Sequence, residues 1–279
     1  VSRGLGDVYK RQIEMLTVVR KHFKKVVLLL NVGNIIDMTD INRITPDAVL
    51  YVWQGGMTGG KGTADVLTGK VSPSGKLPDT IAYKVSDYPS DANFGREKSR
   101  DIYAEDIYVG YRYFETFAKE KVLYPFGFGL SYTAFEIKTE KAEITEGAVK
   151  LSVSVKNIGS YKGKEVIEVY CEAPQGRLGK VARVLCGFEK TRELVPQEEQ
   201  VVEIAVDIAK LASYDDSGVT GNKSCYVLET GEYKFYVGSD VRSAEYACSF
   251  EQGENLVTER LTQSLAPVES FERIKPVCE

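Results

Sequence analysis

An apolar run that leads directly into a glycine-rich loop constrains the fold of this 279-residue chain more than any other feature. Residues 48–53, AVLYVW, predict a buried strand, and glycines follow at positions 55, 56, 59, 60 and 62. A short helix is expected from about Thr63 to Thr68, with Gly69 at its C-terminal end. α/β folds bind ligands where a strand passes through a glycine loop into a helix N-terminus. We therefore expect an α/β domain around this stretch.

The residues before that stretch predict the same class of fold. Residues 13–24 form an amphipathic helical pattern, with one apolar face made of Ile13, Leu16, Val19 and Phe23. Residues 26–31, VVLLLN, are typical of a parallel strand that is covered on both faces. Residues 34–43 are expected to be irregular. The order of these elements indicates a doubly wound α/β layer, or part of one.

Residues 135–250 have a different periodicity. Val149, Leu151, Val153 and Val155 alternate with polar residues, as in a strand with one buried face. The same alternation recurs at residues 167–171, 202–206 and 233–237, with turn residues between these segments. Short alternating strands of this kind predict an all-β antiparallel sandwich of the immunoglobulin-like type. Residues 254–265, which follow it, are compatible with a helix.

The composition excludes several classes of function. Hydrophobic residues make up 43% of the chain and charged residues 27%, which is ordinary for a globular protein. A net charge of −4 gives no electrostatic basis for binding nucleic acid or an anionic membrane. No apolar run is long enough to cross a bilayer. We therefore expect neither nucleic acid nor membrane as a partner.

Cysteine and histidine usage narrows the chemistry further. The five cysteines are odd in number and contain no CxxC pair, which indicates reduced thiols in a cytoplasmic protein. A disulfide among the four cysteines at 171, 186, 225 and 248 is the alternative. His22 is the only histidine, so neither a Ser-His-Asp triad nor a multi-histidine metal site is expected.

The glycine loop also contains a partial phosphate-loop pattern. Residues 55–62 read GGMTGGKG, which gives G-x-x-x-x-G-K followed by Gly62. A phosphate loop needs serine or threonine directly after the lysine to bind the metal, and Thr63 comes one residue late. The alternative is that these glycines allow the backbone to approach a neighbouring domain or a neutral ligand closely. Nucleotide binding is therefore the weakest of the functional hypotheses.

Five sequence motifs occur in order along the first half of the chain: WQGGMTGG at 53–60, ADVLTG at 64–69, PSGKLP at 73–78, EDIYVGYRYF at 105–114 and YPFGFGLSY at 124–132. Together they resemble the C-terminal α/β sandwich domain of family 3 glycoside hydrolases, the β-glucosidase and β-xylosidase group. The family commonly has WxPGQEGG in the first motif, so Met57 and Thr58 depart from it. Residues 155–170 resemble the fibronectin type III-like domain that follows in many of these hydrolases. The resemblance covers roughly residues 13–250 and implies a partial α/β sandwich layer followed by an all-β sandwich.

This resemblance gives the expected domain organisation. Residues 1–12 look like a non-native, adaptor-like segment, residues 13–134 a partial family 3 C-terminal domain, and residues 135–250 the fibronectin type III-like domain. Residues 251–279 are expected to be a linker or tail. Because some relatives have the catalytic barrel after the sandwich domain, we expect that this tail leads to a barrel.

The resemblance also implies a function. Retaining glycosidases use two carboxylates about 5–5.5 Å apart, and in this family the nucleophilic aspartate belongs to a TIM-barrel domain. This chain contains no (βα)₈ pattern and no GxDR-like string, which typically accompanies the acid/base glutamate. We expect part of a β-glucosidase-like enzyme that needs no cofactor or metal. The parent enzyme would act on an oligosaccharide or β-glycoside, and the two domains of this chain would pack on the catalytic barrel. The isolated chain would be inactive. Homo-oligomerisation of the parent enzyme is left open.

Four residues are candidates for contact with the substrate. Trp53 offers a flat face on which a sugar can stack, with Gln54 as a hydrogen-bonding neighbour; the alternative, which we favour, is a core role for Trp53. Glu105 and Asp106 precede an expected aromatic strand at residues 108–114, where apolar surroundings would raise the pKa of a carboxyl group. The favoured alternative is that they are loop carboxylates paired with Arg100 or Arg112. A non-catalytic carbohydrate-binding or scaffolding module is the main alternative function.

Overall fold

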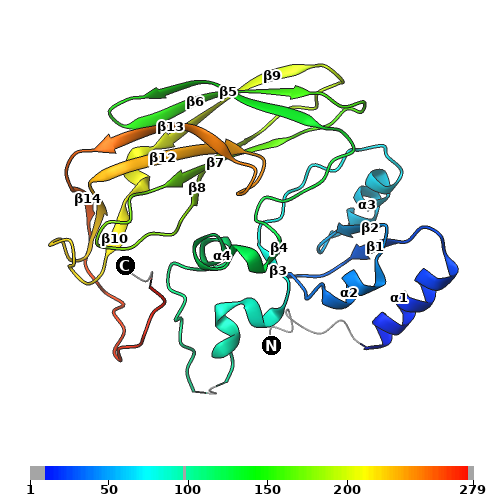
Figure 1. The fold of residues 1–279 in the computed structure, drawn as a ribbon, viewed down its shortest axis with the longest axis horizontal. Coiled ribbons are helices and arrows are strands. Elements are labelled where there is room, and N and C mark those ends of the chain that lie inside the picture. Colours follow the sequence, from blue (N-terminus) through cyan, green and yellow to red (C-terminus); the bar gives the residue numbers. More distant parts are fainter. Residues whose placement is uncertain (1–9, 97–98, 276–279) are drawn as a thin grey trace.

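The computed structural model describes residues 10–96 and 99–275, which form an α/β part and a β-rich part (Figure 1). The α/β part contains α1 (Lys10–His22), β1 (Val27–Leu30), α2 (Thr39–Ile44), β2 (Ala48–Tyr51), α3 (Gly59–Leu67), β3 (Ile81–Ala82), η1 (Val85–Asp87), η2 (Pro89–Ala92), α4 (Tyr111–Phe117), η3 (Lys119–Lys121) and β4 (Val122–Tyr124). The β-rich part contains β5 (Phe135–Ile144), β6 (Ala148–Asn157), β7 (Val166–Glu172), β8 (Val184–Lys190), β9 (Glu199–Asp207), η4 (Ile208–Leu211), β10 (Ser213–Asp215), β11 (Cys225–Leu228), β12 (Gly231–Gly238), β13 (Glu245–Gln252) and β14 (Leu256–Arg260). The predicted fold class, α/β followed by all-β, is confirmed. Most of the segment predicted to be adaptor-like, residues 1–12, lies outside the described residues.

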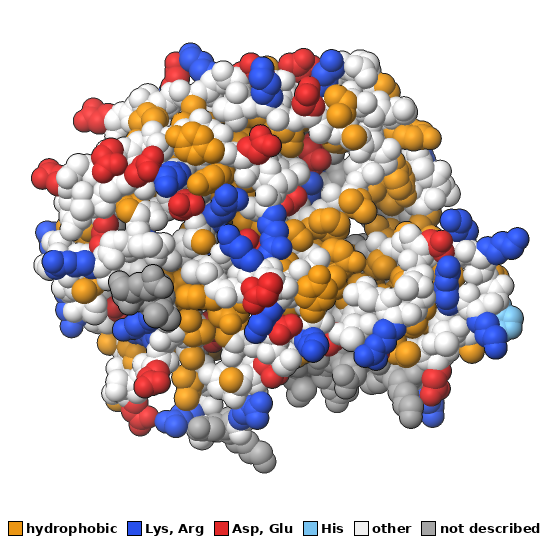
Figure 2. Space-filling model, viewed as in Figure 1, with side chains coloured by type: hydrophobic (Ala, Val, Ile, Leu, Met, Phe, Trp, Pro, Cys, Tyr) orange, Lys and Arg blue, Asp and Glu red, His pale blue; other side chains and the backbone are white. Residues whose placement is uncertain are grey.

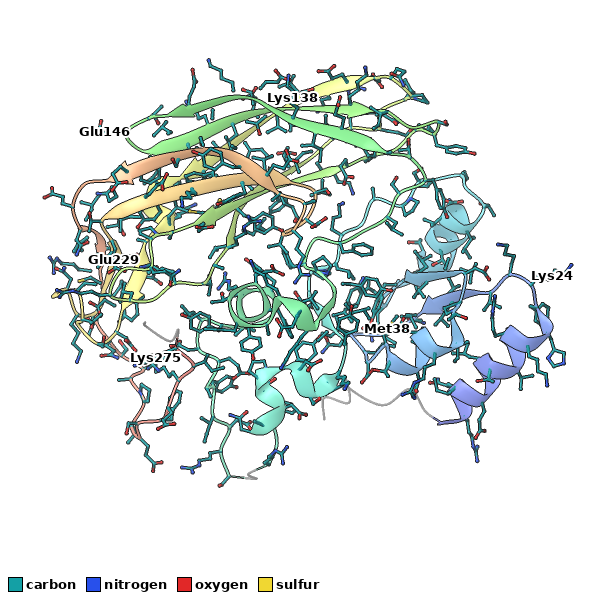
Figure 3. All side chains as sticks on the ribbon, viewed as in Figure 1. Lys24, Met38, Lys138, Glu146, Glu229 and Lys275 are labelled. Carbon is teal, nitrogen blue, oxygen red and sulfur yellow. The ribbon has the colours of Figure 1, made fainter. Side chains whose placement is uncertain are left out.

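The α/β part is built on a parallel pair of strands. β1 pairs with β2 in a register that places Val27 beside Ala48 and Leu30 beside Tyr51. One face of this pair buries an apolar cluster made of Leu30, Ile35, Met38, Ile41 and Ile81. Met38, labelled in Figure 3, lies where α2 meets the strands. The helix–strand order predicted from the apolar periodicity is therefore present, with α2 as an additional short helix inside the segment that we expected to be irregular.

The other face of the β1–β2 pair is uncovered, which corrects one expectation. Val27 is 49% exposed and Leu29 is 41% exposed, although the run 26–31 predicted burial on both faces. Ala48 of β2, the register partner of Val27, is exposed on the same face. These three residues form what we call the open face. An apolar strand face in contact with water is unfavourable, so the open face marks a surface that suits a packing partner.

Two further helices differ from expectation. α3 begins at Gly59, inside the glycine run, instead of near Thr63, and Gly69 follows its end with the positive φ of 74° typical of that position. Residues 108–114 were predicted to form an aromatic strand, and this prediction is wrong. The helix α4 begins at Tyr111 and buries Phe114 completely. A short apolar segment fits the period of a strand or that of a helix, and here the burial of Phe114 on one face favours the helix.

The β-rich part is a sandwich of two antiparallel sheets. One sheet has the strand order β5-β6-β9 and the other β13-β12-β7-β8, and Figure 1 shows the second sheet facing α4. The predicted alternation is confirmed: the apolar residues of β6, β9 and β12 point into one shared core. That core includes Val149, Leu151, Val153, Val155, Ile167, Val169, Val202, Ile204, Tyr233 and Phe235.

A third, smaller sheet closes one end of the sandwich. Its strand order is β10-β11-β14. β14 occupies residues 256–260, so the expected helix at 254–265 is wrong. The β-branched residues Val257 and Thr258 favour a strand, and β14 supplies backbone partners to β11 along an edge that would otherwise be open.

Aromatic packing and one well-shielded ion pair join the two parts. Tyr111 of α4 stacks on Phe126 at 4.4 Å between ring centroids, and its hydroxyl accepts a hydrogen bond of 2.9 Å from the Leu185 backbone N–H. Lys76 pairs with Glu165 at 2.9 Å, with both side chains largely shielded from solvent. Figure 2 shows mixed charges over the β-rich part, while hydrophobic side chains gather below it towards the centre of the molecule. The α/β part is therefore held against the second sheet of the sandwich.

Candidate functional site

The first candidate pair lies where the chain leaves β2. Trp53 has a φ of 52°, a left-handed conformation that is uncommon for a bulky residue, and strained residues of this kind occur often at functional sites. Its half-buried ring packs on the β1–β2 cluster and lies 4.8 Å from the Tyr51 ring. Gln54 is exposed, and its side-chain amide lies over Gly33. A Cβ at position 33 would come within 3.0 Å of the Gln54 Nε2 atom. The site thus combines a partly buried aromatic ring with an exposed amide.

The glycine loop next to this pair does not have the arrangement of a phosphate loop. The Lys61 ammonium lies 2.5 Å from the Asp65 carboxylate, one helical turn further along α3, instead of facing the loop. Gly55 packs directly on Gly59, where a Cβ on Gly55 would come within 2.7 Å of the Gly59 Cα. Gly55 thus allows close packing within the loop itself, while a Cβ on Gly56, Gly59, Gly60 or Gly62 would meet no atom of the described residues within 4 Å. Close approach of these glycines to a neighbouring domain or a neutral ligand stays a prediction.

Asp79 is a further member of this site that we did not single out from the sequence. Its side chain is half-buried, and this burial raises its pKa. No hydrogen bond or ion pair to its carboxylate occurs among the described residues. Burial is the main cause that raises the pKa of the Tyr51 and Tyr88 phenols, and the negative charge of Asp79 raises both further. The pKa of Tyr88 is about 12. The sequence signal that could have identified Asp79 is an acidic residue between Pro78 and the buried strand β3.

The surroundings of Asp79 are otherwise well ordered. The Tyr88 hydroxyl donates to the Thr80 carbonyl at 2.8 Å and accepts from the Ala82 backbone N–H at 3.0 Å. The Tyr51 hydroxyl accepts from the Ile36 backbone N–H at 3.0 Å. The buried Thr80 hydroxyl has no partner among the described residues. Within the part of the chain that the structure describes, the Asp79 carboxylate therefore lies unpaired near two tyrosines, Tyr51 and Tyr88, whose hydroxyls are fixed by hydrogen bonds.

We expect the substitution Asp79→Asn to raise the melting temperature at pH 7. Because the folded-state pKa of Asp79 is raised, the wild-type chain loses stability as the pH increases from the usual range of an aspartate through that higher value. Asparagine does not ionise, so the difference between variant and wild type should be larger at pH 7 than at pH 4. Thermal melts at the two pH values measure this difference. The exposed Asp91→Asn is the matched control, and an equal difference at both pH values would contradict the argument.

The second candidate pair lies in a separate environment. No hydrogen bond or ion pair among the described residues joins Trp53 or Gln54 to Glu105 or Asp106. Asp106 has a φ of 51°, and its carboxylate pairs with Arg273 at 3.2 Å. The arginine on Asp106 therefore comes from the far end of the chain, a partner that the sequence did not suggest.

The arginines near this loop have other contacts. Arg100 pairs with Glu269 at 3.2 Å, and the Arg112 guanidinium lies 6.0 Å from the centre of the Tyr111 ring. Glu105 is partly buried, and its carbonyl accepts a hydrogen bond from the Tyr108 backbone N–H at 2.8 Å. Glu105 and Asp106 are thus loop residues, and the helix α4 follows them where the sequence suggested a strand.

The remaining reactive groups give no second site. The four described cysteines are free, and burial raises the pKa of the Cys186 thiol to about 12 and raises that of Cys171 as well. The described residues contain no cluster of three or more histidine, cysteine, aspartate or glutamate side chains that could hold a metal ion. Two open hollows lie on the β-rich part. One of about 430 Å³ is lined by residues of β7 and β12, and one of about 420 Å³ is lined by residues of η4, β11 and β14. None of the described helices is both long and apolar enough to cross a membrane.

The fold defines a class of protein: a parallel two-stranded α/β layer with an aromatic edge, packed on a fibronectin-like sandwich. Residues 5–132 match the Glycosyl hydrolase family 3 C-terminal domain, and residues 165–241 match the Fibronectin type III-like domain. The chain therefore contains the C-terminal domain of glycoside hydrolase family 3 followed by a fibronectin type III-like domain, as the sequence motifs implied.

Known proteins similar to this chain are β-glucosidases. A β-glucosidase of Ruminococcus albus is 61% identical over 260 residues, which cover 93% of this chain and 27% of that protein. The structure of a β-glucosidase from Paenibacillus barengoltzii is 48% identical and superposes with a TM-score of 0.92, covering 96% of this chain and 30% of that one. Beta-glucosidase 3B from Thermotoga neapolitana, solved in complex with α-D-glucose, is 36% identical with a TM-score of 0.81, covering 90% of this chain and 35% of that one. The chain thus spans about a third of these proteins or less.

Proposed function

We propose that this chain is part of a β-glucosidase whose parent enzyme removes terminal β-linked glucose or xylose from oligosaccharides or glycosides. The observation that carries the proposal is the similarity of both parts, in their relative arrangement, to one β-glucosidase structure, with a TM-score of 0.92 at 48% identity. Retaining glycosidases form a covalent glycosyl-enzyme intermediate on one carboxylate while a second carboxylic acid protonates the leaving oxygen. We assign both of these groups to the part of the enzyme outside this chain. The reaction needs no cofactor.

In this proposal, the chain shapes one wall of the sugar-binding region and supports the catalytic domain. The Trp53 ring and the Gln54 amide suit a sugar, which offers an apolar ring face and hydroxyl groups together. Asp79 supplies a half-buried acceptor for a hydroxyl or a backbone N–H brought by the catalytic domain. These residues would bind and orient, and the bond-breaking step would occur elsewhere.

The open face supports the same proposal. Val27, Leu29 and Ala48 leave apolar surface exposed on one face of a parallel strand pair, and parallel sheets are almost always covered on both faces. The similar β-glucosidases are about three times longer than the matched region, so they contain additional residues that could cover this face. We propose that the catalytic TIM barrel and the missing part of the α/β layer pack here, and that any homo-oligomer forms through another surface.

The purified chain is expected to show no turnover of nitrophenyl β-glucoside or nitrophenyl β-xyloside above the buffer rate, because it lacks the nucleophilic carboxylate. The variant Glu105→Gln, Asp106→Asn should behave in the same way as the unmodified chain. Release of nitrophenol, followed by absorbance, measures both proteins. Turnover that the double variant abolishes would place a complete site within these residues and contradict the proposal.

A carbohydrate-binding module without chemistry is the second candidate, favoured by the exposed amide of Gln54 beside the half-buried Trp53 ring. Calorimetric titration of the chain with cellobiose separates the two functions. A binding module should bind cellobiose and lose affinity with Trp53→Ala. The enzyme proposal predicts no measurable affinity for the chain alone, because most sugar contacts would come from the other domain.

A further inference from the structure

The segment after the sandwich returns to the α/β part. Residues 269–274, which we call the strap, run beside residues 99–107, the carboxylate loop that carries Glu105 and Asp106 (Figure 1). The Ile274 backbone N–H donates to the Ala104 carbonyl at 2.8 Å, so the contact includes the main chain. Lys275, labelled in Figure 3, lies on the same side of the molecule as Glu229, at the end of the sandwich that carries the β10-β11-β14 sheet.

Arg273 is the centre of this contact. Its guanidinium lies 2.6 Å from Asp216 of the sandwich and 3.2 Å from Asp106 of the carboxylate loop. It also lies 5.5 Å from the centre of the Phe271 ring, within the range of a cation–π interaction. The hydrogen bond to Asp216 and the charge of Asp106 raise the pKa of Arg273 above an already high value. One permanently charged side chain therefore joins two carboxylates from the two parts of the molecule.

The two ends of this bridge differ in the hydrogen bonds that hold their backbone. Asp216 follows Asp215, which is completely buried and accepts backbone hydrogen bonds from Gly218 at 2.6 Å, Val219 at 3.1 Å and Thr220 at 2.8 Å. These bonds fix the turn that carries Asp216. Asp106, in contrast, has a left-handed backbone in a short turn whose hydrogen bonds are local, with its own N–H donating to the Tyr103 carbonyl at 3.2 Å. A left-handed conformation of a non-glycine residue persists only where the surroundings hold it.

We propose that the strap fixes the conformation of the carboxylate loop and that Arg273 is the positioning residue that transmits this restraint from the sandwich. A second, more exposed pair between Arg100 and Glu269 lies along the same contact and supports the assignment. The proposal concerns the folded chain itself and does not depend on the proposed glycosidase activity.

The size of the effect follows from the exposure of the contact. The Arg273 side chain is 28% exposed, so its two ion pairs are weaker than buried pairs, and salt screens them in part. Loss of a guanidinium that lies between two carboxylates also leaves their mutual repulsion uncompensated. We therefore expect local opening of the loop to increase without global unfolding.

Hydrogen–deuterium exchange of the full chain, read by mass spectrometry, tests the proposal. In Arg273→Gln, the backbone amides of residues 99–107 and of Ile274 should exchange about 3- to 10-fold faster than in the wild type. The amides of residues 218–220 should be unchanged and serve as an internal reference. Arg273→Lys should restore part of the protection, and 1 M NaCl should bring the wild type towards Arg273→Gln.

Arg192→Gln is the matched control. Arg192 pairs with Glu198 at 2.6 Å on the sandwich, away from the strap, so its loss should leave exchange in residues 99–107 unchanged. Unchanged exchange of the carboxylate loop in Arg273→Gln would overturn the proposal. An equal acceleration in residues 99–107 and 218–220 would also overturn it, because Arg273 would then stabilise the whole fold instead of the loop.

Discussion

Phe235→Ala is expected to destabilise the chain by about 3–5 kcal/mol, because it empties a fully buried position in the main core. Phe235 lies on β12, has no exposed surface, and packs between the two sheets of the sandwich with its ring 6.0 Å from that of Phe250. Removing the ring loses its burial and leaves a cavity that the rigid strands can fill only in part. The free energy of unfolding from urea titration, followed by fluorescence, measures the change.

Phe188→Ala is the control for the same chemical change. Phe188 lies on β8 at the edge of the same sheet and is 68% exposed. Its loss should change the free energy of unfolding by no more than about 0.5 kcal/mol, as is usual for surface substitutions. Equal effects of the two substitutions would show that Phe235 does not lie in the core of the sandwich.

Glu229→Ala is expected to cost about 3–5 kcal/mol, because it leaves a buried lysine without its partner. Glu229 is 3% exposed and Lys180 is 5% exposed, and their side chains form an ion pair. The Glu229 carboxylate also accepts the Arg177 backbone N–H at 2.7 Å, so the substitution removes an acceptor from the turn before β8. Urea titration again gives the free energy of unfolding.

A double variant that removes both charges separates the pair from the rest of the effect. Lys180→Met combined with Glu229→Met should be clearly less destabilised than Glu229→Ala, because no unpaired charge remains buried. Glu193→Ala is the control for an exposed pair: Glu193 bonds Lys162 at 2.8 Å at the surface, and its loss should cost at most about 1 kcal/mol. A double variant as unstable as the single one would show that the Arg177 hydrogen bond, and not the ion pair, determines the loss.

The sandwich could be predicted from the sequence because its signal is local. In β6, every second residue from Val149 to Val155 faces the core, and β9 and β12 repeat this period. A residue's position in such a strand decides its burial directly. The β1–β2 pair was predicted only in part, because the covering of its second face depends on residues that are not its neighbours in sequence. The apolar character of Val27 and Leu29 is the same whether or not a partner covers them.

Local patterns failed where two structures fit one segment. Residues 108–114 are rich in aromatic side chains, which favour strands, yet Phe114 is buried by the helix α4. Residues 254–265 are compatible with a helix, yet β14 forms because β11 has an edge to pair with. In both cases tertiary contacts outweighed the weak preference of the segment itself.

In the candidate site, too, local sequence patterns were informative and contacts between distant residues were not predictable. Trp53 and Gln54 could be nominated from the sequence because they lie where an apolar run ends and a glycine loop begins. The environment of Asp79 depends on Tyr51 and Tyr88, which come from different elements. Arg273 lies 167 residues from Asp106, so no local pattern could have paired them. Local sequence patterns could therefore nominate candidate residues, but they could not show which distant side chains lie against them.

The most direct test of the account is a chimera. The 260-residue region of the Ruminococcus albus β-glucosidase that matches this chain would be replaced by the corresponding residues of this chain, and hydrolysis of nitrophenyl β-glucoside would be measured. We predict that the chimera hydrolyses the glucoside at a rate within about tenfold of that enzyme, while the chain alone does not. A folded, monodisperse chimera without activity would contradict the claim that this chain performs the role of that region in a β-glucosidase.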